Sequence, residues 1–328
     1  MKGGGILALF TIKGVVMNKV YDVAVIGAGP AGLTAALYAA RAGLSVAFFE
    51  RMGAGGQMTS TEHLDNYPGF TDGIDPFTLS FQMAGQAERF GAEQISADIV
   101  KVDLESETKV LEDSAGTTYE ARTVVLAMGA RPRLLGVDRE EELTGKGVSY
   151  CAACDGGFFR GKSVVVVGGG NTAVGDVLYL SRLCEQVYHV HRRDEMRADA
   201  VYVDALQSLE NYTFFGSHKV VEVKDTDGVV SQVVIQPMDA EGDTDQKTLD
   251  VAALFVAVGT QPKNDIIKDS SIEMDKAGYV VADESCVTSI PGVFVAGDLR
   301  TKTLRQVVTA TSDGAIAATA AFDYLSTK

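Results

Sequence analysis

The stretch that decides the fold is residues 21–50, "YDVAVIGAGPAGLTAALYAARAGLSVAFFE". A run of β-branched and apolar residues leads into a glycine turn, then a helix with small residues on one face, then a second apolar run that ends at an acid. This order predicts a strand–helix–strand unit. Residues 162–191, "KSVVVVGGGNTAVGDVLYLSRLCEQVYHVH", repeat it with the same internal spacing. Because the unit occurs twice, the sequence predicts an α/β fold with two Rossmann-like dinucleotide-binding domains.

Each glycine turn is expected to hold a pyrophosphate. The first glycine permits the tight turn, the second lets the backbone approach the phosphates, and the third allows the helix to pack closely on the strand. The phosphates then meet the partial positive charge at the helix N-terminus. A glycine motif alone is weak evidence, but here a strand precedes each motif and a helix follows it. The expected contacts are Gly27, Gly29 and Gly32 in the first unit and Gly168 and Gly170 in the second.

The residue 23 positions after the first glycine distinguishes the two units. In the first unit it is Glu50, which can accept hydrogen bonds from a ribose and would repel a 2′-phosphate. In the second unit it is a histidine that begins "HRRDEMR" (191–197). Guanidinium groups at this position suit a 2′-phosphate, whereas the alternative is an exposed charged face. We therefore expect FAD in the first unit and NADPH in the second, with NADPH contacts from His191, Arg192, Arg193 and Arg197.

A second pair of similar segments indicates how the domains are connected. "VVLAMGARP" (124–132) and "LFVAVGTQP" (254–262) each predict a buried strand that ends at a glycine and a proline. If each closes one unit, the second domain is inserted into the first. The expected division is a disordered extension over 1–16, a discontinuous FAD-binding domain over 17–131 and 263–328, and an NADPH-binding domain over 132–262 that carries a Cys-x-x-Cys pair.

Composition excludes several classes of protein. The 328 residues are 46% hydrophobic and carry a formal net charge of −15, so the surface is expected to repel nucleic acid and anionic membranes. Four cysteines are too sparse for a disulfide scaffold, which favours a cytoplasmic protein. The apolar run near the N-terminus is interrupted by Lys13 and lacks a cleavage signal, so no signal peptide is predicted. No apolar stretch reaches the ~18–20 residues that a membrane span needs.

The segment "CAACD" (151–155) could be a structural staple, half of a metal site or a redox pair. A zinc site would need four ligands, and the remaining candidates, Cys184, His189 and His191, fall within the second dinucleotide-binding unit. No metal is therefore predicted. A Cys-x-x-Cys pair in a cytosolic chain is instead a candidate reversible dithiol, for which flavin and NADPH would supply the electrons. The acid that follows the pair could pass the required proton.

Eight ordered motifs give the sequence a family resemblance. Between Val20 and Leu325 it resembles the low-molecular-weight, bacterial-type thioredoxin reductases, in the motifs "GAGPAG", "GGQM" (55–58), "NYPG" (66–69), "CAACDG", "GGGNTA", "HRRDEMR", "GVFVAGD" and "RQVVTA" (305–310). The resemblance implies an FAD domain in two segments, an NADPH domain that carries the cysteines, a homodimer, large rotation between the domains, and thioredoxin as the protein substrate.

The resemblance also implies roles for individual residues. Cys154 would lie against the flavin, Cys151 would attack the thioredoxin disulfide, and Asp155 would be the acid/base. Beside the glycines of the first turn and Glu50, the implied FAD contacts are Gln57, Asn66, Gly129, Asp298, Arg305, Gln306 and Val307. Beside the residues already assigned to NADPH, the implied contacts are Asn171 and Thr172.

Two departures from the family pattern concern the cofactor sites. Gly175 and Asp176 stand where the family often has an acidic pair, and glycine inside a helix costs roughly 1 kcal/mol relative to alanine. This departure bears on the geometry on the nicotinamide side. Met128 replaces a threonine that is usual in the family and bears on flavin packing.

Three other functions fit parts of the sequence. A peroxiredoxin-reducing relative would be expected to carry an additional N-terminal thioredoxin-like domain, and a ferredoxin-fed relative would be expected to lose the basic ribose patch. A non-catalytic flavin redox sensor would keep the dithiol without turning over NADPH. The expected function remains NADPH-dependent reduction of thioredoxin through FAD and the Cys151–Cys154 pair.

Overall fold

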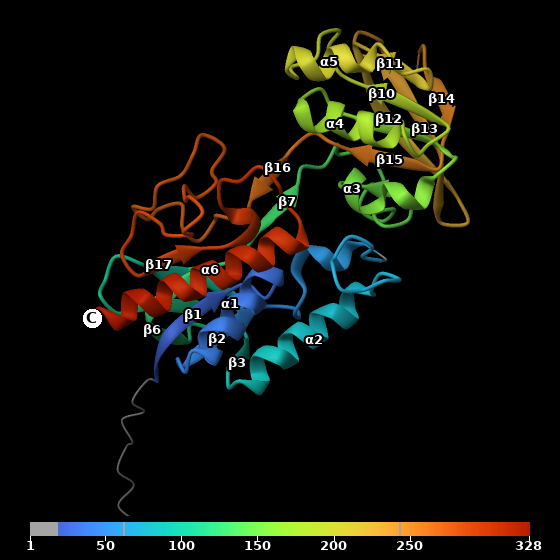
Figure 1. The fold of residues 1–328 in the computed structure, drawn as a ribbon. Coiled ribbons are helices and arrows are strands. Elements are labelled where there is room, and N and C mark those ends of the chain that lie inside the picture. The colour runs from blue at the N-terminus through green and yellow to red at the C-terminus, as the bar shows by residue number, and fades with distance from the viewer. Residues whose placement is uncertain (1–18, 62, 243) are drawn as a thin grey trace, which may run out of the picture.

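The computed structural model describes residues 19–61, 63–242 and 244–328, and the extension expected over 1–16 lies outside this range. The described chain forms two bodies, at lower left and upper right in Figure 1. The lower body is built from strands and helices before residue 132 and after residue 262, and the upper body from those between. No helix of the described ranges combines the length and the apolar character that crossing a membrane requires.

A seven-stranded sheet forms the centre of the lower body. Its order is β3–β2–β1–β6–β5–β4, and β17 also pairs with β6. Beside its pairing with β1, strand β6 is long enough to serve two further partners, because β5 pairs antiparallel with its first part and β17 parallel with its last three residues. The strands are β1 (Val20–Ile26), β2 (Val46–Glu50), β3 (Glu93–Ser96), β4 (Ile99–Asp103), β5 (Lys109–Asp113), β6 (Thr118–Leu126) and β17 (Val293–Val295).

Helices cover one face of this sheet, and the irregular segment 264–292 contributes to the apolar cluster on the other. The helices are α1 (Pro30–Arg41), α2 (Pro76–Arg89) and α6 (Val307–Ser326), with short 3₁₀ turns η1 (Gly56–Ser60) and η3 (Gly297–Leu299). Helices α1 and α6 pack closely through glycine, since a Cβ on Gly314 would lie 2.2 Å from the carbonyl oxygen of Ala31. This packing fixes the α6 N-terminus beside the first glycine turn (Figure 1).

The upper body has three layers. A parallel sheet in the order β11–β10–β9–β15–β8 lies between helices and an antiparallel sheet in the order β12–β13–β14. Its strands are β8 (Val148–Ser149), β9 (Ser163–Val167), β10 (Gln186–Val190), β11 (Tyr212–Phe215), β12 (His218–Thr226), β13 (Val229–Pro237), β14 (Lys247–Asp250) and β15 (Ala253–Val256). Its helices are α3 (Ala152–Asp155), α4 (Asn171–Leu180) and α5 (Ala200–Leu206), with the 3₁₀ turn η2 (Gly156–Phe159).

The chain passes between the two bodies twice, through two short strands that lie side by side. Strands β7 (Ala130–Pro132) and β16 (Thr260–Pro262) pair antiparallel, and Figure 1 shows them between the two bodies. The expected domain boundaries fall at the ends of this pair and stay predictions. Because both crossings lie side by side, rotation about this ribbon would need backbone changes in only a few residues.

Candidate active site

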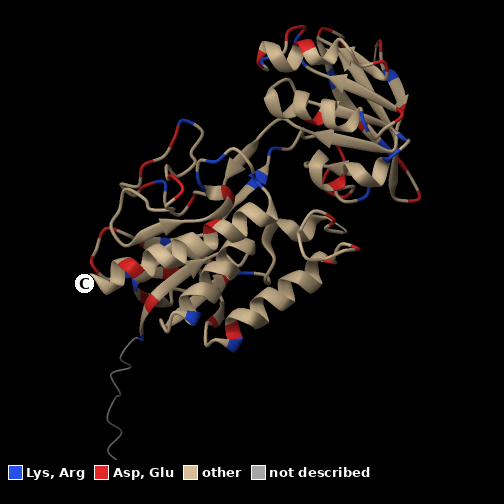
Figure 2. Cartoon of the chain, in the orientation of Figure 1, with Lys and Arg blue, Asp and Glu red and all other residues tan. Residues whose placement is uncertain are grey.

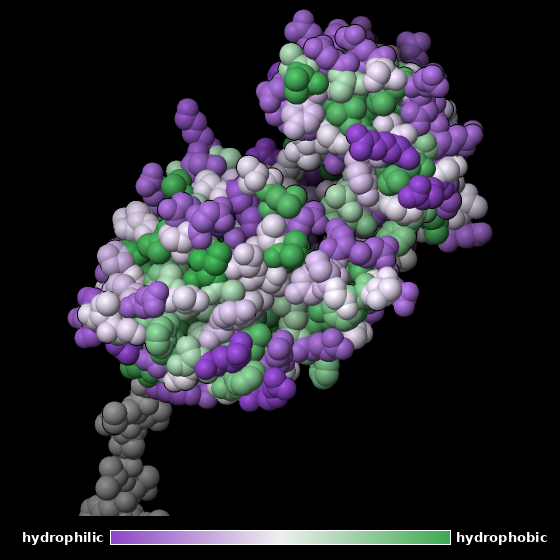
Figure 3. Space-filling model, viewed as in Figure 1, coloured by the Kyte–Doolittle hydropathy of each residue, from purple (hydrophilic) through white to green (hydrophobic). Residues whose placement is uncertain are grey.

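A cavity of about 300 Å³ lies where the two bodies approach each other. Its lining comes from the first glycine turn, η1, the segment after β6, the cysteine segment and the start of α6. The space-filling view in Figure 3 shows the surface hollowed between the bodies. The lining includes all of the residues expected to contact FAD except Gly32, namely Gly27, Gly29, Glu50, Gln57, Asn66, Gly129, Asp298, Arg305, Gln306 and Val307.

The first glycine turn has the form that a pyrophosphate site requires. Gly27 has a φ of +100°, and a Cβ there would lie 2.5 Å from the carbonyl oxygen of Ala127. A Cβ on Gly32 would lie 1.8 Å from the carbonyl oxygen of Gly27, so α1 packs directly on the turn. Gly29 has no such close neighbour, since a Cβ there would lie 3.9 Å from the nearest atoms. The first and third glycines therefore serve packing, and the second leaves open backbone.

Glu50 lies at the end of β2 beside this turn. One carboxylate oxygen accepts a hydrogen bond from the amide of Ala28 at 3.1 Å, and the other accepts one from the amide of Arg51 at 2.9 Å. The acid thus occupies the position expected for a ribose contact, next to the backbone that would hold the phosphates.

Two buried polar atoms at this cavity have no hydrogen-bond partner in the described structure, Oδ1 of Asp298 and Nε of Arg305. Burial raises the pKa of Asp298, and the nearby Lys302 and Arg305 oppose this shift. An unpaired buried polar atom costs roughly 1–3 kcal/mol, so a polar ligand in the cavity would offset that cost. The glycine turn, the ribose-side acid and these unpaired atoms together fit FAD.

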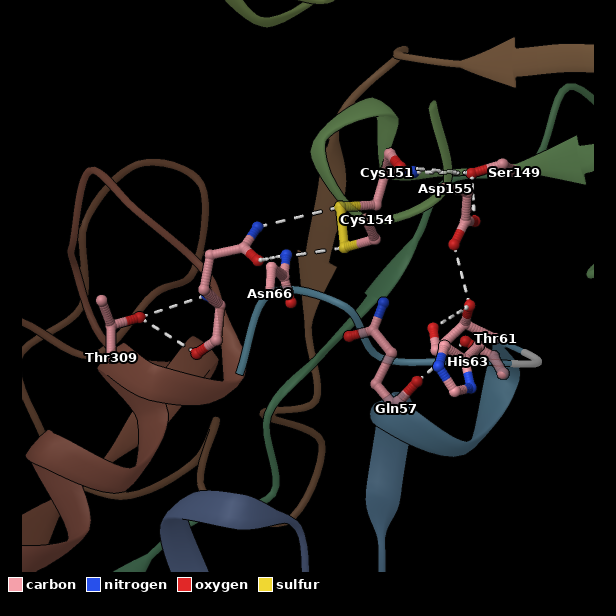
Figure 4. The surroundings of a disulfide bond; sticks show 11 residues. Gln57, Thr61, His63, Asn66, Ser149, Cys151, Cys154, Asp155 and Thr309 are labelled. Carbon is pink, nitrogen blue, oxygen red and sulfur yellow. Dashed lines mark hydrogen bonds between the residues drawn. A yellow bond between two sulfur atoms is a disulfide. The ribbon is translucent and has the colours of Figure 1, made fainter. Parts of the chain in front are cut away.

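The Cys151–Cys154 disulfide lies on the wall of the same cavity (Figure 4). Cys151 precedes α3, and its carbonyl oxygen accepts hydrogen bonds from the amides of Cys154 and Asp155, both at 3.1 Å. Gln306, just before α6, contacts both sulfur atoms, with Nε2 3.8 Å from Sγ of Cys151 and Oε1 3.9 Å from Sγ of Cys154. Asn66 donates to the same Oε1 at 3.1 Å. The predicted flavin-side residues and the redox pair are thus brought together.

Asp155 is held by one hydroxyl from each body. Oγ1 of Thr61 lies 2.8 Å from one carboxylate oxygen, and Oγ of Ser149 lies 2.6 Å from the other. Ser149 also accepts a hydrogen bond from the amide of Cys151 at 3.1 Å, so the acid and the cysteine segment share one network.

The second glycine turn lies apart from the cavity, in the upper body. Gly168 has a φ of +150°, and a Cβ there would lie 2.3 Å from the carbonyl oxygen of Ala257. Beneath the turn, the fully buried His189 must donate through Nε2 to the carbonyl oxygen of Gly168, at 2.8 Å. Burial lowers the pKa of His189 to about 4, so the imidazole is neutral at physiological pH. This histidine supports the turn.

The basic residues expected at the ribose gather beside this turn. A Cβ on Gly169 would lie 2.3 Å from Nε2 of His191, and the amide of Arg197 donates to the carbonyl oxygen of Gly169 at 2.6 Å. Burial lowers the pKa of His191, and the positive charges of Arg197, Arg192 and Arg193 lower it further. The unpaired Nε2 of His191 is buried beside the turn, which fits a polar ligand such as the adenosine part of NADPH.

For two of the residues expected to contact NADPH, Asn171 and Thr172, the structure supports that contact less directly. The amide side chain of Asn171 pairs with Asp199, donating through Nδ2 to a carboxylate oxygen at 2.9 Å and accepting from the Asp199 amide at 2.8 Å. Thr172 is exposed at the start of α4. None of the residues expected to contact NADPH lines the cavity that holds the disulfide.

Helix α4 continues through Gly175 without a break, and a Cβ on Gly175 would meet no atom within 4 Å. The neighbouring Asp176 makes no hydrogen bond or ion pair with any residue in the described ranges. Burial alone raises its pKa to about 7. The departure from the family's acidic pair therefore leaves the helix intact and leaves one carboxyl that is neutral below neutral pH.

Asp176→Asn is expected to stabilise the protein at pH 8 and not at pH 3. Below the unfolded-state pKa the carboxyl is protonated in both states, and as pH rises through the folded-state pKa near 7 the native protein must bury a charge. Since the side chain keeps some solvent contact, the gain at pH 8 should be about 1–2 kcal/mol. Urea unfolding followed by circular dichroism at both pH values measures it, with the exposed Asp250→Asn as control. Equal effects at both pH values would contradict the assignment.

Comparison with known proteins gives the family. A family model described as pyridine nucleotide-disulphide oxidoreductase matches residues 21–314. A thioredoxin reductase from Peptoclostridium acidaminophilum is 44% identical over 313 residues, which are 94% of this chain and 98% of that protein. The chain belongs to the thioredoxin reductases. The resemblance in the sequence is thereby confirmed, as is the α/β fold with two Rossmann-like domains.

Two solved thioredoxin reductases differ in how well they superpose. The enzyme from Streptococcus pyogenes MGAS5005 gives a TM-score of 0.87 at 40% identity, covering 95% of this chain and 100% of that one. The Lactococcus lactis enzyme, in a structure described as the FR conformation, gives 0.65 at 35% identity, covering 94% and 100%. The two structures have similar sequence identity to this chain and cover it almost equally, but the second has a much lower TM-score. A different arrangement of two rigid bodies produces such a difference.

Two contacts of this thioredoxin reductase site were missed by sequence reasoning. Thr61 and Ser149 hold Asp155, but neither stands in a pattern that indicates proton chemistry. Thr61 is 94 positions from Asp155, and only the arrangement of the two bodies brings them together. The signal in the sequence was limited to the nearness of Thr61 to "GGQM" and of Ser149 to "CAACD".

Proposed function

We propose that this chain is an NADPH-dependent flavoprotein that reduces the disulfide of thioredoxin through FAD and the Cys151–Cys154 pair. FAD and NADPH are the cofactors of its family. One observation carries the proposal, namely that the disulfide lies on the wall of the cavity that the first glycine turn and Glu50 also line. A structural staple would not need a place beside a flavin site.

When bound, FAD supplies the two-electron chemistry between NADPH and the disulfide. The protein binds the cofactor and positions the disulfide beside it. Gly29 leaves room for the pyrophosphate, Glu50 lies where the ribose is expected, and Asp298 and Arg305 have unpaired polar atoms for the ligand. Gln306 touches both sulfur atoms from the flavin side of the cavity and keeps the disulfide at that wall.

Within the pair, we assign Cys154 to the flavin and Cys151 to thioredoxin. The thiolate of Cys151 attacks the thioredoxin disulfide, and Cys154 then releases the reduced thioredoxin as the Cys151–Cys154 bond re-forms. Asp155, linked through Ser149 to the amide of Cys151, holds and moves the proton that this exchange requires.

The domain division of 17–131 with 263–328 and of 132–262 belongs to the same proposal, with rotation about β7 and β16 as its consequence. The disulfide and the nicotinamide need the same flavin, yet the second glycine turn lies outside the cavity. Rotation would exchange the two, and the lower TM-score of the Lactococcus lactis structure supports two arrangements.

We further propose a cytoplasmic homodimer. The two cysteines outside the redox pair are free and buried, as suits a reducing compartment. Figure 2 shows positions of acidic residues, in red, spread along the chain in both bodies, in keeping with the net charge of −15 and with a surface that repels nucleic acid.

The deciding experiment is NADPH consumption by the FAD-loaded enzyme with purified thioredoxin, under anaerobic conditions. Reduction of thioredoxin by NADPH supports the proposal, and reduced ferredoxin replaces NADPH in a control. A flavin that NADPH bleaches slowly or not at all would point to a redox sensor. A peroxiredoxin in place of thioredoxin tests the other protein acceptor.

Replacing Arg192 and Arg193 together by alanine should raise the KM for NADPH at least tenfold, about 1.4 kcal/mol. These guanidiniums gather near His191, where the 2′-phosphate is expected. NADH lacks that phosphate, so its KM should change little. Steady-state kinetics with both nucleotides measure the difference, and equal losses with NADPH and NADH would refute the assignment.

A further inference from the structure

The inference rests on the proposed function and concerns the hydroxyl of Thr61, which reaches Asp155 from the lower body. Thr61 follows η1 in the flavin-side part of the chain, whereas Asp155 belongs to the cysteine segment of the upper body. Their side chains lie 2.8 Å apart (Figure 4). A rotation that removed the disulfide from the flavin would also remove Asp155 from Thr61.

The Thr61 hydroxyl has a second acceptor within its own body. Its Oγ1 lies 3.2 Å from the carbonyl oxygen of His63. When Asp155 is ionised, the hydroxyl can donate to the carboxylate. When Asp155 is protonated, the hydroxyl can turn to His63 and accept from the acid instead. Thr61 therefore suits both protonation states of Asp155, and it keeps a partner when the bodies separate.

Ser149 donates a hydrogen bond to the other carboxylate oxygen. A rotation of the bodies would leave this contact in place, because Ser149 and Asp155 both belong to the upper body. Its hydroxyl is also tied to the cysteine segment by the amide of Cys151. Of the two hydroxyls on the acid, one is thus permanent and one depends on the arrangement of the bodies.

A small cavity of about 30 Å³ also borders Asp155. This volume can hold a water molecule, which needs roughly 10–15 Å³ in the same measure. Thr61, Ser149 and Asp155 line it, together with Gly145, Gly147, Val148, Phe158 and Phe159. Among the described residues of that lining, Asp155 is the one titratable group, and it also lines the larger cavity. The acid therefore borders both the flavin cavity and a small space that can hold water.

Reduction of the disulfide by NADPH needs a supply of protons from water. The hydride from NADPH brings two electrons and one proton, and opening the Cys151–Cys154 bond to two thiols consumes two electrons and two protons. One proton must therefore come from solvent for each disulfide reduced. Asp155, which contacts both cavities, can give that proton to the released sulfur and regain it from the small cavity.

We propose that Thr61 is a positioning residue for Asp155 that acts only while the disulfide faces the flavin. It holds the acid for proton delivery during reduction of the disulfide, and domain rotation removes it before exchange with thioredoxin. The two half-reactions then use the same acid with different support, two hydroxyls in the first and Ser149 alone in the second.

The test separates the two half-reactions in Thr61→Val, which has no hydroxyl, and Thr61→Ser, which keeps it. Anaerobic stopped-flow of the holoenzyme with one equivalent of NADPH and no thioredoxin follows flavin reoxidation as the disulfide is reduced. Thr61→Val should slow this step about tenfold, as expected for a lost hydrogen bond to a charged group, and Thr61→Ser should stay within about twofold of the unmodified enzyme.

The second half-reaction is read in the holoenzyme, whose dithiol is first reduced chemically under anaerobic conditions and then mixed with oxidised thioredoxin in the absence of NADPH. Both Thr61 variants should exchange at the unmodified rate, whereas Asp155→Asn should be slow. Equal slowing of both half-reactions by Thr61→Val, no slowing of either, or a serine variant as slow as valine would overturn the proposal. Thr61→Ala gives the same comparison if the valine variant does not fold. An unmodified enzyme that fails to reduce thioredoxin would refute the proposed function instead.

Discussion

The Cys154→Ser enzyme is expected to accumulate a stable mixed disulfide with thioredoxin through Cys151. Thioredoxin is released only when the second cysteine of the pair attacks the mixed disulfide. With that cysteine replaced by serine, the complex persists until an external thiol resolves it. Non-reducing electrophoresis of the mixture should show a covalent complex that dithiothreitol dissolves. Turnover with NADPH and thioredoxin should fall by at least about a thousandfold, since neither single cysteine can complete the cycle.

The flavin spectrum gives an independent reading of the same assignment. A thiolate beside an oxidised flavin produces a long-wavelength absorbance band. Cys151→Ser should keep that band, because Cys154 remains at the flavin, and Cys154→Ser should lose it. If the band and the trapped complex appeared in the opposite variants, the two roles would be reversed. If either variant still reduced thioredoxin at the normal rate, the pair would be structural.

The sequence predicted the parts of the fold that local patterns determine. The strand–helix–strand unit expected over 21–50 is present as β1, α1 and β2, and its repeat as β9, α4 and β10. These units are readable because a glycine turn between an apolar strand and a small-residue helix requires only neighbouring residues. The packing roles of Gly27 and Gly32 follow from the same short motif.

Contacts between distant segments could not be predicted in this way. Gln306 is 155 positions from Cys151, and Thr61 is 94 positions from Asp155. Both contacts cross from one body to the other, so they depend on how the two bodies are arranged. No local pattern encodes that arrangement, because the ribbon of β7 and β16 that links the bodies is only three residue pairs long.

The polar partner of a motif residue is equally hidden from sequence reasoning. Asn171 stands at a position that the resemblance assigns to NADPH, but its side chain pairs with Asp199 in the segment before α5. Nothing in the spacing of the two residues indicates this pair. In the proposed site, NADPH would have to share Asn171 with Asp199 or displace the acid, which would make Asp199 a neighbour of the nucleotide that no sequence motif marks.

Asp155→Asn is expected to slow exchange with thioredoxin by about 10²–10⁴-fold, the usual contribution of a positioned acid/base. Asparagine has nearly the same shape, so its carbonyl oxygen can accept from one of the two hydroxyls and its amide can donate to the other. The geometry is kept, but the side chain can no longer carry a proton. FAD binding and the number of titratable thiols should therefore remain unchanged, which separates this effect from misfolding.

The measurement is the rate at which the reduced enzyme reduces thioredoxin, together with FAD content and thiol titration. Asp250→Asn makes the same chemical change on the exposed strand β14 of the same body and serves as the matched control. A near-normal rate in Asp155→Asn would mean that the proton reaches the sulfur by another path. Loss of FAD or of the disulfide would mean that the carboxylate holds the two bodies together and has no part in proton transfer. Slow exchange with both cofactor and cysteines intact is the outcome that makes Asp155 the acid/base of this enzyme.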